Sequence, residues 1–464
     1  MKKFSDKYLN VTSKILSTPL SIAFLLTFAT IIFSLVVKSN QSIGLIDASK
    51  QVAIAWNKGL WDPSTGGLYF AFQMMFMLVM GHTIALTPVA QNIIQALIKS
   101  CSNSAKSAFI VCFITIILSY FNWSLGLIFG AILARNIGEK FSIENKKINY
   151  PLIVSSAYTG MLIWHGGFSG SAPTKVMEDN SLNQMVAHLN ISVPTNIPLE
   201  MTIGSSMNLY IAIMSIILLP LIVFFIGKKV KEDTLNLSPF KMLDKKFTKK
   251  VKLSGAEKID FSRWFIRIIG FLIIIVCFVH VNETPIQNKL GFINPNFINL
   301  FLLGLTLVLH KHIHSFINSV QNAIGDISGI LIQFPLYFGI LGIMKEAGLI
   351  ELISNQLISI STINTLPFYT FLSAGIVNFF VPSGGGQWAI QGPIIIQSVA
   401  YLNADLPKTI MAMAYGDQLT NMLQPFWALP LLGITKSKAK DILPYTFLFF
   451  VVGFILFGSA LLIF

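Results

Sequence analysis

Residues 378–393 read Asn-Phe-Phe-Val-Pro-Ser-Gly-Gly-Gly-Gln-Trp-Ala-Ile-Gln-Gly-Pro and interrupt an otherwise apolar part of the chain. The apolar runs on either side, 366–381 and 384–398, are shorter than the about 20 residues that a membrane-crossing helix needs. A proline and three glycines favour a break in the helix between them. Irregular backbone at membrane depth is tolerated only where it lines protein or a water-filled cavity. We therefore expect a re-entrant hairpin or a discontinuous helix here.

The composition of the whole chain agrees with a membrane protein. Of the 464 residues, 54% are hydrophobic and 11% are charged, against about 25% charged residues in a typical soluble domain. This composition excludes a soluble enzyme, a disordered chain and a disulfide-rich secreted scaffold. The apolar runs are continuous rather than alternating, which argues against an outer-membrane barrel. The fold class that remains is an all-α polytopic membrane protein with about 11–13 membrane segments.

The basic residues, which give a net charge of +13, indicate topology. With residue 1 in the cytoplasm, the inside pieces 1–16, 88–106, 135–149, 227–263, 310–315 and 424–441 hold 25 of the 33 Lys and Arg. The outside pieces 38–67, 166–202, 282–296, 345–365 and 399–408 hold 7. Such a bias is what membrane insertion produces, so we expect no nucleic-acid partner and a cytoplasmic N-terminus. An anionic-lipid or nucleic-acid patch in 227–263 is the alternative interpretation.

The two halves of the chain resemble each other weakly. An offset of about 257 residues aligns Ala157-Tyr158 with Ala414-Tyr415, and Pro173 with Pro430. The predicted directions of the segments are opposite in the two halves, as in inverted-repeat transporters. We expect a scaffold helix and outer loop in 1–67, a first repeat in 68–226, a basic linker in 227–263, scaffold helices in 264–324 and a second repeat in 325–464.

Four polar clusters lie at matching places in these repeats: 122–126, 166–171, 378–393 and 417–425. Their glycines let the backbone unwind, and the N-terminus of a half-helix offers N–H groups and a partial positive charge that suit a carboxylate. Carbonyl groups at unwound ends suit Na⁺. Close packing of membrane helices through small residues is the alternative explanation.

Asp417 is an acid inside an apolar segment, where ionisable groups are costly and usually functional. It is a candidate to accept a coupling proton or to bind Na⁺, and a structural hydrogen-bonded acid is the alternative. Asp326 is explained by a position at the start of a helix. We interpret His82 and His165 as core histidines rather than proton relays, and His310, His312 and His314 as part of a cytoplasmic loop.

Enzyme motifs are lacking in the sequence. Gly384–Gly386 is not followed by the Lys and Ser or Thr of a phosphate-binding loop, and Cys101, Cys112 and Cys277 lack metal or redox spacing. No base neighbours Ser169 or Ser383 as a hydrolase would require. We expect no enzyme activity and no metal or cofactor beyond a coupling H⁺ or Na⁺.

The sequence resembles the bacterial short-chain fatty acid transporter family at 122–127, 166–173, 378–393 and 414–430, and over nearly the whole chain. It departs from the family pattern in having Asp417 for Glu, Gln387 for His and His165 for a small residue. The resemblance implies transport of acetoacetate, butyrate and similar monocarboxylates. It also implies the plan of the ion-transporter superfamily, with a scaffold and a mobile transport domain.

We therefore expect a secondary transporter of small monocarboxylates in the bacterial cytoplasmic membrane, coupled to H⁺ or Na⁺. The alternatives are a dicarboxylate or Na⁺/H⁺ carrier of the same plan and, from another class, a membrane-embedded enzyme. The expected partners are the substrate and the lipid bilayer, and a homodimer is left open. Asp417 is the candidate for ion coupling. The candidates for substrate binding are Asn122, Ser169, Gly170, Ser171, Asn378, Ser383, Gly384, Gly385, Gly386, Gln387, Asn421 and Gln424.

Overall fold

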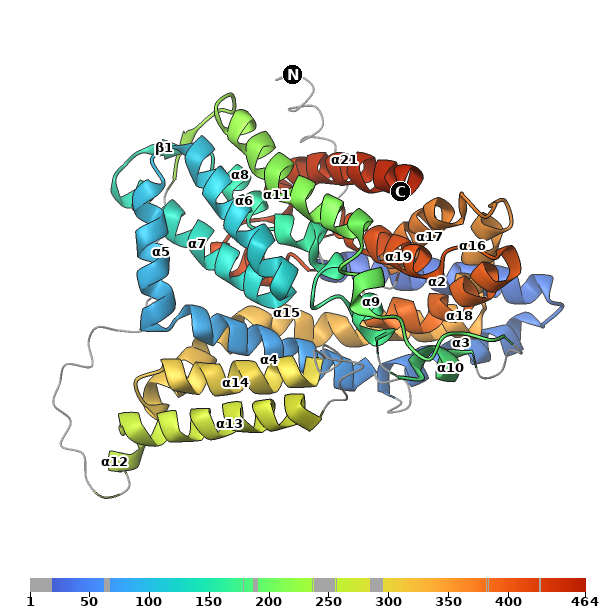
Figure 1. Cartoon of the computed structure of the whole chain (residues 1–464), viewed down its shortest axis with the longest axis horizontal. Coiled ribbons are helices and arrows are strands. Elements are labelled where there is room, and N and C mark those ends of the chain that lie inside the picture. The colour runs from blue at the N-terminus through green and yellow to red at the C-terminus, as the bar shows by residue number, and fades with distance from the viewer. Residues whose placement is uncertain are drawn as a thin grey trace.

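The protein is almost entirely helical in a computed structural model that describes residues 19–61, 67–177, 179–186, 191–235, 237, 255, 257–283, 295–380, 382, 384–424 and 427–464 (Figure 1). Within these ranges the only sheet is a two-residue pair of β1 (Lys147–Ile148) with β2 (Asp233–Thr234), antiparallel. This confirms the predicted all-α class. Ser383 and most of the basic linker lie outside the described residues.

Five described helices are long and apolar enough to cross a membrane, or six if a bent pair is counted as one span. The five are α2 (Pro19–Asn40), α6 (Ser104–Phe121), α11 (Ser206–Gly227), α13 (Arg263–Glu283) and α21 (Ala439–Ile463). The bent pair consists of α4 (Gly67–Ala85) and α5 (Pro88–Ser100), whose described parts meet at 68°. The shorter apolar helices are α14 (Pro295–Leu309) and α17 (Leu366–Phe380). By length and composition the described residues thus give five or six candidate spans and two shorter apolar helices, and the count of 11–13 segments stays a prediction.

The break between α6 and α7 (Trp123–Ile143) lies where the sequence predicts it. Asn122 ends α6, because its N–H donates to Leu118 O at 2.8 Å, and it starts α7, because its side chain accepts from Leu125 N at 2.9 Å. The glycines of α7 serve packing: a Cβ on Gly126 would lie 2.0 Å from Ser119 Oγ. The small-residue explanation is therefore correct for Gly126.

A second break separates α17 from α18 (Gly384–Leu402), and each broken pair is followed by a further helix that ends inside the molecule. After α7 this is α8 (Tyr150–Ser156), which continues as 3₁₀ turns at Thr159–Leu162 and Trp164–Gly166. After α18 it is α19 (Leu406–Thr420). The remaining short elements are α9 (Ser171–Lys175), α10 (Ser181–Met185), a 3₁₀ turn (Leu199–Met201), α12 (Glu257–Asp260), α16 (Leu349–Ile358) and α20 (Leu429–Thr435).

Three helices of ten or more residues, α3 (Leu45–Trp61), α5 and α16, form where we expected only connecting pieces. The stretch predicted as an outer loop contains α3, which packs on α2 and on α15 (Ile313–Glu346). In α5, buried residues recur at Ala90, Ile94 and Ile98, and Thr87 caps the first turn. The sequence signal was therefore amphipathic spacing, which a search for long apolar runs does not find.

The start of α15 corrects the interpretation of Asp326. His312 and Ser315 form a capping box, so the helix begins at Ile313 rather than near residue 325. Asp326 therefore lies within the helix and not at its N-terminus. The predicted boundary between scaffold and second repeat, at 324 and 325, falls inside this one continuous helix.

Pieces that the charge bias assigns to one side of the membrane are joined in the structure. Ser104 donates to Glu232 at 2.6 Å and accepts from Asn149 N at 2.8 Å, which joins 88–106, 227–263 and 135–149. Tyr150, directly after 149, donates to Thr435 O of the piece 424–441 at 3.0 Å. These contacts show that the four pieces lie at one end of the molecule, as predicted.

The helices form two groups (Figure 1). In one group α13, α14, α4 and α15 pack in that order, with α2 and α3 against α15. In the other, α6, α7, α8 and α11 come from the first half of the chain, and α17, α18, α19 and α21 come from the second. The unwound segment after α8 meets α19 and α18 inside the second group, which is where the polar side chains gather.

Candidate functional site

The site is built on the unwound segment 157–170. Here the chain leaves the α-helix after Ser156 and turns back through glycines that approach other backbone closely. A Cβ on Gly167 would lie 2.3 Å from Tyr120 O, and one on Gly170 would lie 2.1 Å from His165 O. These glycines therefore have a packing role, and they let the turn place His165 against α19.

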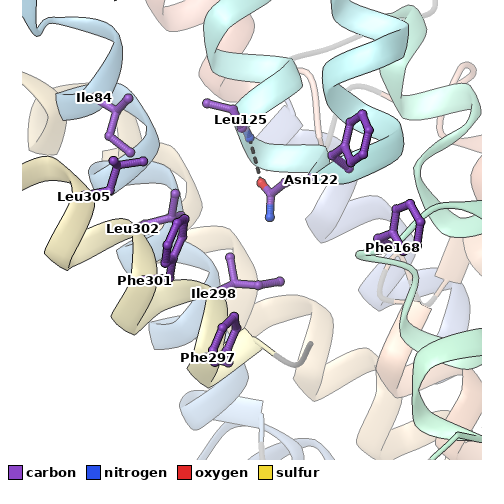
Figure 2. A pocket seen from close by; sticks show the side chains of 10 residues that line it. Ile84, Asn122, Leu125, Phe168, Phe297, Ile298, Phe301, Leu302 and Leu305 are labelled. Atoms are coloured by element: carbon purple, nitrogen blue, oxygen red, sulfur yellow. Dashed lines mark hydrogen bonds between the residues drawn. The ribbon is translucent and has the colours of Figure 1, made fainter. Parts of the chain in front are cut away.

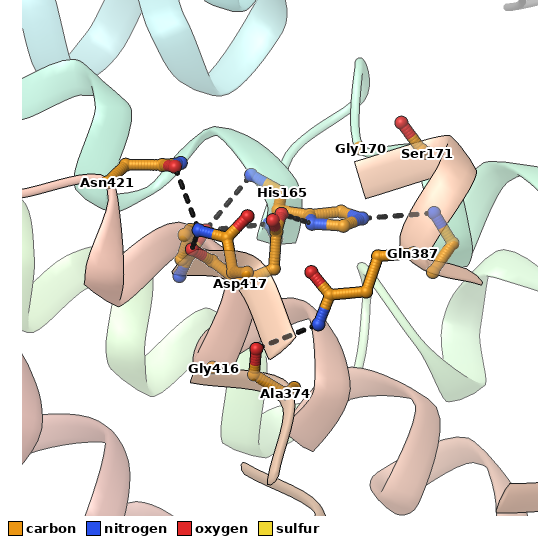
Figure 3. A network of polar contacts seen from close by, with 12 residues as sticks. His165, Gly170, Ser171, Ala374, Gln387, Gly416, Asp417 and Asn421 are labelled. Carbon is orange, nitrogen blue, oxygen red and sulfur yellow. Dashed lines mark hydrogen bonds and ion pairs between the residues drawn. The ribbon is translucent and has the colours of Figure 1, made fainter. Parts of the chain in front are cut away.

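His165 and Asp417 form a buried pair at the centre of the site (Figure 3). Imidazole Nδ1 lies within hydrogen-bond distance of carboxylate Oδ2, and the two side chains are 0% and 1% exposed. The other ring nitrogen, Nε2, accepts the N–H of Ala172 at 3.1 Å. A neutral imidazole carries one proton, so this contact assigns the proton to Nδ1, which donates to Asp417. The arrangement fits a neutral histidine and an ionised aspartate.

Gln418 fixes the backbone around His165. Its Oε1 accepts from His165 N at 3.0 Å and from Gly166 N at 3.2 Å, which ties the unwound segment directly to α19. From the other side, Asn208 of α11 donates to Gly166 O at 2.8 Å, and Tyr415 donates to Asn208 Oδ1 at 2.9 Å. The position of the imidazole is therefore set by side chains from both halves of the chain.

The N-terminus of α18 abuts the pair. A Cβ on Gly384 would lie 2.7 Å from His165 Cε1 and 3.2 Å from Asp417 Oδ2, so only glycine fits there without displacing them. The first turn of a helix has N–H groups without helical partners and carries a partial positive charge. This helix end is well placed to stabilise negative charge beside Asp417.

Amide side chains surround the same place. Asn378 Nδ2 donates to Asp417 O at 2.8 Å and to Asn421 Oδ1 at 3.0 Å, and Gln424 Nε2 donates to Asn378 O at 3.1 Å. Gln387 Nε2 donates to Ala374 O at 2.8 Å, and its amide oxygen is turned toward the pair (Figure 3).

Four buried amide atoms in this network have no hydrogen-bond partner among the described residues. Two are donors, Gln418 Nε2 and Asn421 Nδ2, and two are acceptors, Asn378 Oδ1 and Gln387 Oε1. Buried polar atoms are almost always hydrogen-bonded, because leaving one unpaired costs about 1–3 kcal/mol. Several unpaired polar groups around one buried acid are consistent with a site that binds a polar ligand.

Comparison with known proteins gives the family. The chain matches the model of the short chain fatty acid transporter family over residues 1–464. The chain belongs to this family. A protein of Escherichia coli (strain K12) with the name "Putative short-chain fatty acid transporter" is 32% identical over 456 residues, covering 96% of this chain and 97% of the relative. A Haemophilus influenzae protein of the same name is 34% identical over 441 residues, covering 93% of each chain.

Two solved transporter structures align over most of the chain with 13% sequence identity each. The YdaH transporter of Alcanivorax borkumensis aligns over 96% of this chain and 98% of its own, with a TM-score of 0.48. MtrF of Neisseria gonorrhoeae aligns over 97% of each chain, with a TM-score of 0.42.

The structure gathers part of the predicted site of this family member. Asp417, Asn378, Asn421, Gln424, Gln387 and Gly384 lie in or against the network around His165, with Gly385 and Gly386 in the same first turn of α18. Gly170 and Ser171 lie at the start of α9, beside Ala172. Ser383 lies outside the described residues.

Asn122 and Ser169 lie apart from the amide network. Ser169 Oγ accepts from Trp123 N at 3.0 Å, at the start of α7, and Asn122 lines a separate apolar cavity. Aromatic rings connect this region to the amide network. The ring centroids of Trp123 and Trp164 are 6.2 Å apart, and Trp164 stacks on His165 with a centroid distance of 4.5 Å.

His165, Gln418 and Asn208 belong to the site but were not predicted from the sequence as parts of it. We interpreted His165 as an ordinary core histidine, but it bonds to the one acid singled out as functional. A signal was available: His165, Gln387 and Asp417 are the three departures from the family pattern, and all three are at this site. Gln418 is adjacent to Asp417, whereas Asn208 gave no sequence signal.

Proposed function

We propose that the protein is a proton-coupled transporter of short monocarboxylates such as butyrate and acetoacetate in the bacterial cytoplasmic membrane, with its N-terminus in the cytoplasm. The family supports the substrate class, and the excess of Lys and Arg in one set of joined connecting pieces supports the orientation. The observation that carries the mechanism is the buried His165–Asp417 pair beside the N-terminus of α18, among unpaired amide groups.

A carboxylate substrate would be held by donors without a second fixed charge. The N–H groups of Gly384 and Gly385, with the unpaired nitrogens of Asn421 and Gln418, are the candidate donors. Among the described residues, none that hydrogen-bonds to His165 or Asp417 is Lys or Arg. Neutral donors suit a single carboxylate better than a dicarboxylate, which would bring two charges into the same buried space.

Charge explains why a proton would accompany the substrate. With Asp417 ionised and His165 neutral, the empty site carries one negative charge. A second negative charge about 4 Å away would cost on the order of 4 kcal/mol at an effective dielectric constant of 20. Proton uptake by the pair removes this repulsion, so that anion and proton bind together. Oδ2 of Asp417 already faces an N–H group, which favours proton exchange at this carboxylate over direct coordination of Na⁺.

The two tyrosines aligned by the 257-residue offset support the inverted-repeat plan. Tyr158 of the first repeat donates to Asn421 O in the second at 3.1 Å, and Tyr415 of the second donates to Asn208 of the first at 2.9 Å. Each repeat thus supplies the equivalent hydroxyl to the other. A substrate site between the repeats near the bilayer midplane is typical of this plan.

Uptake by proteoliposomes that contain the purified protein tests the function. Labelled butyrate is the substrate, and unlabelled acetoacetate, succinate and citrate are competitors. We expect acetoacetate to compete and the other two to have little effect, with the label recovered as butyrate. Equal competition by succinate would favour a dicarboxylate carrier, and recovery of the label in another compound would favour an enzyme.

A further inference from the structure

A cavity of about 430 Å³ lies between α14 and α4 on one side and the α6–α7 break on the other (Figure 2). Its volume is within the range of small-molecule sites. One wall consists of Phe297, Phe301 and Leu302 of α14, and the opposite wall includes Leu125 and Phe168. The two walls belong to the two different helix groups of the fold.

The lining is apolar except for one side chain. Nine of the ten described lining residues are hydrophobic, none is charged, and the tenth is Asn122. Its Oδ1 is occupied, because it accepts from Leu125 N at 2.9 Å and from Ser124 Oγ at 2.8 Å. The amide nitrogen therefore remains as a donor, and it is turned toward the cavity (Figure 2). A matching ligand has an apolar body and one hydrogen-bond acceptor.

The cavity adjoins the polar site through a short stretch of chain. Asn122 precedes Trp123, whose N–H donates to Ser169 Oγ, and Phe168 on the cavity wall precedes Ser169. Trp123 then reaches His165 through Trp164. Packed aromatic rings therefore connect the cavity wall to the segment that carries His165.

We propose that this cavity binds the alkyl chain of the transported acid, with the acid's oxygen on the Asn122 amide, and that it sets the chain-length preference. The inference rests on the proposed function and adds a binding place that is separate from the Asp417 network. Burying alkyl carbons there gains about 0.8 kcal/mol per CH₂, which corresponds to roughly fourfold in affinity per added carbon until the space is filled. The size of the cavity therefore sets the chain length that binds best.

Two opposite changes in cavity size test the proposal. Leu302→Trp reduces the space, and Phe301→Ala enlarges it. Uptake of labelled butyrate by proteoliposomes is measured with acetate, butyrate, hexanoate and octanoate as competitors. We expect Leu302→Trp to weaken the inhibition of butyrate uptake by hexanoate and octanoate at least tenfold. The inhibition by acetate should change less than twofold. We expect Phe301→Ala to shift the preference toward octanoate. Phe265→Ala, on an exposed site of α13, is the control.

The outcomes distinguish a failure of the proposed function from a failure of the inference about the cavity. If the wild-type protein carries no monocarboxylate, the proposed function fails. If the wild-type protein carries monocarboxylates and neither variant alters the order in which the acids inhibit butyrate uptake, the cavity does not bind the alkyl chain. A uniform loss for all acids in both variants would also overturn the inference, because a structural lipid in the cavity would give that result. Asn122→Leu provides a second readout: we expect weaker binding of every acid with the chain-length order preserved.

Discussion

His165 and Asp417 are separated by 252 positions in the chain, yet the imidazole and the carboxylate are hydrogen-bonded partners in the buried interior. The histidine is on the unwound segment after α8, and the aspartate is in α19. Their contact therefore joins the two halves of the chain at one polar point. It also joins them where α18 begins, so that any movement of α18 or of the unwound segment alters the surroundings of the acid.

The energetic coupling of this pair can be measured with a double-mutant cycle. His165→Ala leaves a buried carboxylate without its donor, which costs at least about 1–3 kcal/mol because the unpaired group is charged. Asp417→Asn removes the charge. We expect the double variant to be less destabilised than the sum of the single variants, by about 0.5–3 kcal/mol. Thermal unfolding in detergent measures this, and additive effects would contradict the pairing. His280→Ala, at an exposed position on α13, is combined with Asp417→Asn as the control cycle. The effects of these two substitutions on stability should be additive.

Gly384 is expected to tolerate no side chain. In Gly384→Ala the new methyl group would lie 2.7 Å from His165 Cε1 and must displace the ring. Overpacking of this kind costs about 1–3 kcal/mol. We expect butyrate uptake to fall at least tenfold while the protein remains folded in size-exclusion chromatography. Gly325→Ala in α15, where a Cβ would have no neighbour within 4 Å, should keep uptake near the wild-type rate. Normal uptake by Gly384→Ala would show that this helix end does not control the site.

The tyrosine hydroxyls should have matching effects in the two halves. Tyr158→Phe and Tyr415→Phe each remove one buried hydrogen bond, worth about 1 kcal/mol of stability. We expect each variant to lower the unfolding temperature and to slow butyrate uptake. Tyr401→Phe, at a side chain that is 85% exposed, is the control and should do neither. A loss in only one of the two variants would argue against equivalent roles.

The orientation can be tested by labelling single cysteines with a membrane-impermeant maleimide. The native cysteines Cys101, Cys112 and Cys277 are buried, which favours low background labelling. Lys146→Cys and Lys231→Cys report on joined basic pieces, and Tyr401→Cys reports on the predicted outer side. In intact cells we expect label on Tyr401→Cys alone, and on all three variants after permeabilisation. Labelling of Lys231→Cys in intact cells would reverse the predicted orientation.

The sequence was sufficient to predict the fold class and both helix breaks, because these follow from local composition. Proline and glycine in 382–386, and a polar cap at Asn122, interrupt apolar runs and so end one helix before the next begins. The helices α3 and α5 were missed because their apolar residues form one stripe rather than a continuous run. The early start of α15 depends on the capping box at His312 and Ser315, a two-residue signal within a polar stretch.

The candidate site was predictable in residue types but not in its pairing. The sequence singled out Asp417 as an unusual intramembrane acid, and the amides around it as its neighbours. Which histidine lies against that acid depends on how the unwound segment turns, and close backbone contacts at Gly167 and Gly170 decide this turn. Such contacts are tertiary, so neither periodicity nor spacing reports them. The role of Asn122 also depends on α14, which is remote in the sequence.

Uptake under separately imposed ion gradients tests the central claim most directly. Labelled butyrate is offered to proteoliposomes with an inward H⁺ gradient, an inward Na⁺ gradient or no gradient, for the wild-type protein, Asp417→Asn and Asp405→Asn. Asp405 caps the opposite, exposed end of α19, and Asn preserves that cap. We predict that only the H⁺ gradient drives accumulation in the wild-type protein and in Asp405→Asn. Asp417→Asn should still exchange butyrate across the membrane but accumulate none. Gradient-driven accumulation by Asp417→Asn, or accumulation driven by Na⁺ alone, would contradict the account.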